Sequence, residues 1–112
     1  MTDPADLPQL PPELVREYLR ASLERVALFE RSAARLAADA GDRGALESLR
    51  HEAHLVRGSA GTFGFPEAGR LAQNMEETAK HWLAESGPVA EPRAPVVVRF
   101  ADELRRAFTG DR

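Results

Sequence analysis

The sequence predicts an all-α protein, an up-down four-helix bundle with a proline-rich N-terminal segment. Apolar residues recur at alternating spacings of three and four in four separate segments, which is the period of an amphipathic helix. Prolines lie before or between these segments and not in their interiors, where they would break a helix. Because no single helix can bury its own apolar stripe, the four stripes are expected to pack together.

The first two helices are expected at about residues 12–40 and 44–63. Gly41 is a typical helix terminator, and a short turn from Gly41 to Gly44 separates the two patterns. The first apolar stripe consists of Val15, Leu19, Ser22, Val26, Phe29, Ala33, Leu36 and Ala40. The second consists of Leu46, Leu49, Ala53, Val56, Ala60 and Phe63.

The third and fourth helices are expected at about residues 66–85 and 95–109. Pro66 suits the first turn of a helix, where its missing N–H would have no partner. The run Val96-Val97-Val98 would also suit a short strand, but the spacing that follows it favours a helix. The third stripe is Ala68, Ala72, Met75, Ala79 and Trp82, and the fourth is Val97, Ala101, Leu104 and Phe108.

Composition places the 112 residues in one domain spanning 1–112 and excludes several classes of protein. There is no cysteine, so a disulfide framework and a thiolate metal site are excluded. The 15 basic and 18 acidic residues are interspersed, which argues against a nucleic-acid surface. No apolar run reaches the length of a membrane span, and the acidic N-terminus does not resemble a secretion signal. We expect a cytoplasmic monomer.

His54 stands out on the second helix because periodicity places it about 120° from the centre of the core stripe, facing solvent. His51, Leu55 and Gly58 fall on the same side, and Arg57 lies between this side and the core. An exposed neutral imidazole is a nucleophile near physiological pH. With steric room at Gly58 and a cation at Arg57, the pattern suits acceptance of a phosphoryl group.

The segment from Ala53 to Gly64 resembles the signature of histidine-containing phosphotransfer (HPt) domains. The signature has a His, a basic residue three positions later, then Gly-Ser, and a Gly at the tenth position, which here are His54, Arg57, Gly58-Ser59 and Gly64. The form Gly61-Thr62-Phe63-Gly64-Phe65 is especially similar to the N-terminal phosphoacceptor domain of chemotaxis-type histidine kinases. Arg57 stands where Lys is more usual, which preserves the charge.

The resemblance continues into the third helix and implies further site residues. Glu76 matches a Glu that accepts a hydrogen bond from the imidazole Nδ1–H, which leaves Nε2 as the nucleophile. Gln73 stands where that kinase family tends to carry a second His in a hydrogen-bonding position. By the helical wheel, Glu76 and Gln73 share one flank, about 80° from the core centre for Glu76.

The resemblance implies a phosphocarrier and not an enzyme, since the chain has no ATP-binding motif. The expected partner is a response-regulator receiver domain, a histidine kinase, or both. A receiver would bring the acceptor aspartate and the Mg²⁺, so no cofactor of the chain's own is expected. Docking is expected around an apolar patch with Leu55 and a polar rim with His51 and Arg50.

Other interpretations of the same residues remain open. His51 and His54 are three residues apart, not the four of a metalloprotease helix, and a third ligand is not evident, so no metal site is expected. Ser59 either donates a hydrogen bond to a helix carbonyl or assists at the site. The chain could also be an isolated N-terminal domain of a chemotaxis-like kinase, or a helical adaptor that binds receivers without being phosphorylated.

Overall fold

The helices begin where the sequence carries initiation signals. Proline occupies one of the first two positions of α1 (Pro12–Ala38), α3 (Pro66–Ala84) and α4 (Ala94–Thr109). α2 (Arg43–Ser59) is initiated by Asp42, whose carboxylate accepts a hydrogen bond from the backbone N–H of Ala45 at 3.0 Å. The segment Val96-Val97-Val98 lies within α4, so the helical interpretation of this segment is confirmed and the strand is excluded.

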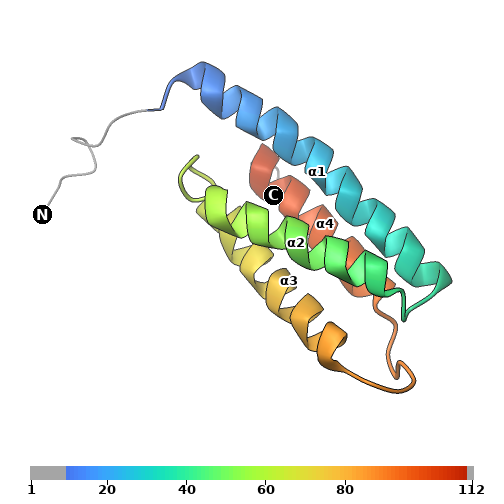
Figure 1. Cartoon of the computed structure of the whole chain (residues 1–112). Helices are drawn as coiled ribbons and strands as arrows, with labels where there is room; N and C mark the ends of the chain where they lie inside the picture. The colour runs from blue at the N-terminus through green and yellow to red at the C-terminus, as the bar shows by residue number, and fades with distance from the viewer. Residues whose placement is uncertain (1–9, 111–112) are drawn as a thin grey trace, which may run out of the picture.

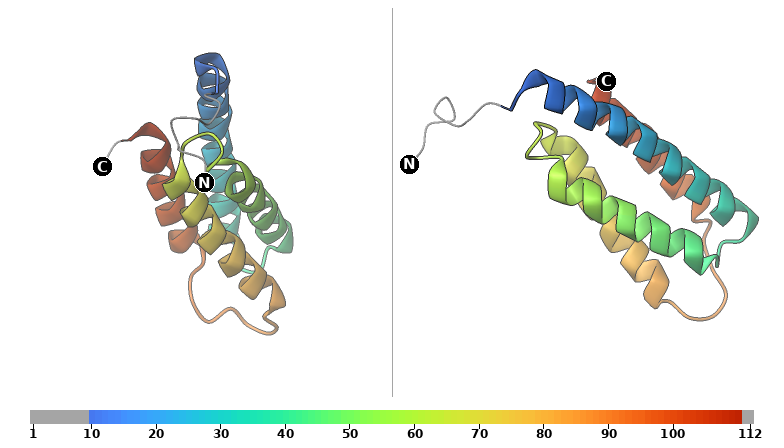
Figure 2. Two further views of the ribbon diagram at one scale, coloured as in Figure 1. Left: turned by 90° about the vertical axis from the view of Figure 1, so that its left-hand side faces the viewer. Right: turned by 45° about the horizontal axis from the view of Figure 1, so that its top comes forward.

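The computed structural model describes residues 10–110, in which the four helices form an up-down bundle (Figure 1). Consecutive helices run in opposite directions, and α1 and α3 each pack against both α2 and α4 (Figure 2). The predicted fold class is confirmed. Most of the proline-rich N-terminal segment lies outside the described residues. Within residues 10–110, no helix has the length and apolar character needed to cross a membrane.

The core consists of the predicted stripes, which meet along the bundle axis. Phe29 of α1 packs edge-on against Phe100 of α4, with ring centroids 4.9 Å apart. Val15, Leu19, Ala40, Phe63 and Trp82 lie at stripe ends and are only partly buried. The other stripe residues of all four helices are buried: Ser22, Val26, Phe29, Ala33, Leu36, Leu46, Leu49, Ala53, Val56, Ala60, Ala68, Ala72, Met75, Ala79, Val97, Ala101, Leu104 and Phe108.

The end of α2 differs from the expected boundary at residue 63. Regular α-helix stops at Ser59, and residues 60–64 form turns. Gly64 has a φ of 91°, its N–H donates to Gly61, and the N–H of Phe65 donates to the carbonyl of Ala60 at 2.8 Å. This is a Schellman arrangement, which requires a left-handed residue and explains the glycine. The apolar spacing continues beyond the end of the regular helix at Ser59. It extends to Phe63 because the ring of Phe63 stacks on Tyr18 of α1.

Candidate functional site

α2 presents His54 to solvent because its opposite face is fixed in the core. Ala53 and Val56 are fully buried, and these neighbours set the rotation of the helix. The His54 side chain is 58 % exposed, as the helical wheel predicts. The imidazole therefore lies on the surface of the bundle, on a helix held rigidly from behind.

Glu76 of α3 contacts this imidazole from the interior of the bundle. Its Oε2 lies 2.9 Å from His54 Nδ1, while its side chain is only 2 % exposed. An ionised carboxylate is only an acceptor, so Nδ1 carries the proton and donates it to Glu76. Nε2 is then the nitrogen with the free lone pair, and it has no hydrogen-bond partner within residues 10–110. The expected proximity of Glu76 and His54 is observed, although Glu76 is more deeply buried than a helix flank implies.

Two cations neutralise the buried carboxylate. Arg57 Nη1 donates to Glu76 Oε1 at 2.8 Å, and Lys80 Nζ lies 3.4 Å from Oε2. The sequence predicts Arg57 as a cation for a phosphoryl group on His54, whereas in this structure its guanidinium binds Glu76. Lys80 was not identified from the sequence. Its position four residues after Glu76, on the same face of α3, is the signal that could have indicated it.

The pKa of Glu76 reflects this balance of burial and charge. Burial alone would raise the pKa of the carboxyl group, because it disfavours the charged form. Hydrogen bonds from Arg57 and His54, together with the charge of Lys80, outweigh burial and lower the pKa from 4.5 to about 2. Glu76 is therefore a carboxylate throughout the physiological pH range. It accepts a hydrogen bond from His54 Nδ1–H, and the proton stays on Nδ1.

We expect this lowered pKa to make the protein less stable in acid. A carboxyl group with a lower pKa in the folded state stabilises the fold above its unfolded pKa, and this contribution is lost as pH falls from about 5 toward 2. Because Arg57, His54 and Lys80 are half-exposed and screened by water, we expect a loss of about 1–2 kcal/mol. Urea unfolding at several pH values, on the wild type and on Glu76→Gln, measures it. Equal acid slopes for the two proteins would contradict the prediction.

The remaining predicted site residues form no ion pair or side-chain hydrogen bond with Glu76 within residues 10–110. Leu55, His51 and Gln73 are exposed, and the Gln73 side chain makes no hydrogen bond within this range. A Cβ added to Gly58 would meet no atom within 4 Å, so the surface one turn beyond His54 is open. Gly64 lies in the turn after α2 and not beside the imidazole.

Ser59 bonds to its own helix and to α1. Its hydroxyl donates to the carbonyl of Leu55 at 2.9 Å and therefore accepts from the hydroxyl of Tyr18, 2.7 Å away. The backbone hydrogen bond considered for Ser59 is thus the one that the structure contains. Tyr18, which was not predicted as a site residue, connects the end of α2 to α1 through this bond and through its stacking on Phe63. These contacts fix the turn of α2 that follows His54.

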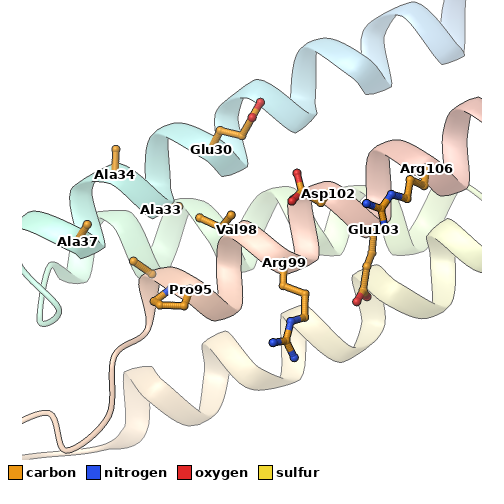
Figure 3. Close-up of a pocket in the computed structure, with 11 residues that line it drawn as sticks. Glu30, Ala33, Ala34, Ala37, Pro95, Val98, Arg99, Asp102, Glu103 and Arg106 are labelled. Carbon is orange, nitrogen blue, oxygen red and sulfur yellow. The ribbon is translucent and has the colours of Figure 1, made fainter. Parts of the chain in front are cut away.

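Two other features of the described chain lie apart from His54. A groove between α1 and α4 is lined by small apolar residues such as Ala34 and Ala37 and by charged residues such as Asp102 and Arg106 (Figure 3). Every residue that lines it belongs to α1 or α4, so it includes none of the site residues on α2 and α3. No group of three His, Asp or Glu side chains within residues 10–110 is arranged to hold a metal ion.

Comparison with known proteins agrees with this geometry. The family model described as Hpt domain matches residues 13–109, which span all four helices except the first residue of α1. No curated protein and no solved structure matches this chain. The members of the matched family carry phosphoryl groups in phosphorelay signalling, where they interact with receiver domains and kinases. The chain, with an exposed histidine on a four-helix bundle, belongs to the Hpt domain family.

Proposed function

We propose that His54 Nε2 is the atom that accepts the phosphoryl group and that a receiver-domain aspartate is its exchange partner. One observation carries the proposal: an exposed imidazole whose Nδ1 is 2.9 Å from a buried carboxylate. This contact fixes the tautomer and the ring orientation, so the Nε2 lone pair points to solvent. Within residues 10–110, His51 and His81 lack such a buried partner.

The transfer follows from the chemistry of these groups. The Nε2 lone pair attacks the phosphorus of an aspartyl phosphate, an N–P bond forms, the P–O bond to the aspartate breaks, and the aspartate leaves as a carboxylate. The imidazole keeps its Nδ1 proton and becomes a positively charged phosphoimidazolium. Glu76 lies against that proton and stabilises the new positive charge. The reverse reaction uses the same contacts.

The surface around His54 supports docking of such a partner. Leu55 is an exposed large hydrophobic residue beside the imidazole, and Gly58 leaves open space one turn further along. A glycine inside a helix costs about 1 kcal/mol relative to alanine, and packing within the chain does not require this one. We infer that Gly58, which has no side chain, leaves room for the receiver to approach His54. His51 and Arg50 then lie at the polar rim of the docking surface.

The direct test is phosphoryl transfer from a labelled donor. The protein is mixed with a phosphorylated receiver domain and Mg²⁺, or with a histidine kinase domain and ATP, and the labelled adduct is tested for chemical stability. We expect an adduct that is labile in acid and stable in alkali, as a phosphoramidate is. The absence of label from every donor would overturn the proposal and favour an adaptor that binds receivers without being phosphorylated.

A further inference from the structure

Lys80 occupies a distinctive place in this chain. It is the only lysine among the 15 basic residues, all the others being arginine. Its Nζ lies 3.4 Å from Glu76 Oε2, the same oxygen that accepts the hydrogen bond from His54 Nδ1. The Lys80 side chain is 54 % exposed, so packing in the core does not explain why a lysine stands at this position.

The carboxylate of Glu76 creates a difficulty for a nucleophilic histidine. A negative charge beside an imidazole favours the imidazolium, which has no lone pair to attack phosphorus. Arg57 and Lys80 together place two positive charges against the one negative charge. A proton on Nε2 would add a third positive charge, which these cations repel, whereas a phosphoryl group on Nε2 brings its own negative charges. Glu76 can orient the imidazole without holding it protonated.

The groups that face this carboxylate come from two helices. α2 contributes His54 and Arg57, and α3 contributes Lys80. Within residues 10–110, no charged group of α1 or α4 contacts Glu76, and His51 is exposed on α2 three residues before His54. Arg57 bonds to Oε1, whereas Lys80 shares Oε2 with the imidazole. Lys80 is therefore the cation that contacts the same carboxylate oxygen as the imidazole.

We propose that Lys80 is a positioning residue for phosphoryl acceptance: its charge on Glu76 Oε2 disfavours the imidazolium and keeps His54 nucleophilic at lower pH. This role rests on the proposed function of His54. A unit charge on the far side of one carboxylate oxygen, in a largely aqueous environment, shifts a proton equilibrium by about half a pH unit, or roughly threefold. Removing the charge is expected to leave more of the imidazole protonated, and therefore unreactive, at mildly acidic pH.

The first measurement follows proton uptake by the His54 ring, by NMR titration of its carbon-bound protons. In Lys80→Met the midpoint is expected to move up by about half a pH unit, whereas Lys80→Arg, which keeps the charge, leaves it in place. Arg70→Met is the matched control, since it removes another exposed cation from α3. Arg70 is paired with Glu67 and lies ten residues away, about 15 Å along α3, beyond the screening length of physiological salt.

The second measurement is the rate of phosphoryl acceptance as a function of pH. Lys80→Met is expected to be roughly threefold slower than wild type at mildly acidic pH, and to approach the wild-type rate as the pH rises. An unshifted titration with normal phosphorylation of the wild type would overturn the role of Lys80 alone. A wild type that takes no label from any donor would instead overturn the proposed function.

Discussion

A His54→Gln variant is expected to take up no phosphoryl group from any donor that labels the wild type. Glutamine can keep a hydrogen bond to Glu76 through its amide, but it has no lone pair comparable to that of Nε2 and cannot form the N–P bond. Because the His54 side chain is 58 % exposed, the free energy of unfolding is expected to change by less than about 1 kcal/mol. Labelling in the presence of Mg²⁺, with thermal unfolding as the check on folding, measures both.

The chain supplies two matched controls for this prediction. His51→Gln removes an exposed histidine from the same helix, and His81→Gln removes one from α3 whose Nε2 is occupied by Glu85 at 3.2 Å. Both variants are expected to accept phosphoryl groups, because neither ring is oriented by a buried carboxylate. Label retained by His54→Gln, or lost with His81→Gln, would assign the phosphoryl group to another residue and contradict the proposal.

The helices were predictable because the signals that define them are local. Apolar spacing of three and four reports which face is buried, and Pro12, Pro66 and Pro95 mark three first turns. The end of α2 was not predictable in the same way. The spacing continues to Phe63, because that ring is placed against Tyr18, a residue 45 positions earlier in the chain. A periodic apolar pattern indicates which residues are buried, not which are helical. Here the pattern extends to the partly buried Phe63, four residues beyond the end of the α-helix at Ser59.

The residues of the site could be predicted from the sequence, but the burial of Glu76 could not. His54, Arg57 and Glu76 carry the family signature, and their helical positions bring them to facing sides of α2 and α3. A helical wheel gives the angle of a residue around its axis, but not the distance between two helices. α2 and α3 approach closely, since a Cβ on Gly69 would lie 3.8 Å from that of Ala60. Glu76 lies on the side of α3 that faces α2, where its side chain is only 2 % exposed.

The consequence of this burial for Glu76→Gln is a large kinetic effect with little change in fold. We expect the variant to accept phosphoryl groups about 10–100-fold more slowly than the wild type, by analogy with the losses found when the partner that orients a metal-binding histidine is removed. The neutral amide no longer offsets the charge of the phosphoimidazolium. If its oxygen faces His54, its NH₂ group faces Arg57, which is also a donor.

Glu77→Gln is the matched control for this prediction, because it removes a carboxylate from the next residue of α3, where the side chain is exposed. We expect wild-type rates from it. Nitrogen-15 NMR of the His54 ring separates orientation from general damage: the wild type should hold its proton on Nδ1, and Glu76→Gln should show a mixture of tautomers. A helical, folded Glu76→Gln protein with an unchanged rate would remove Glu76 from the mechanism. The paired loss of rate and of tautomer preference would instead show that the buried carboxylate acts by determining which nitrogen is free.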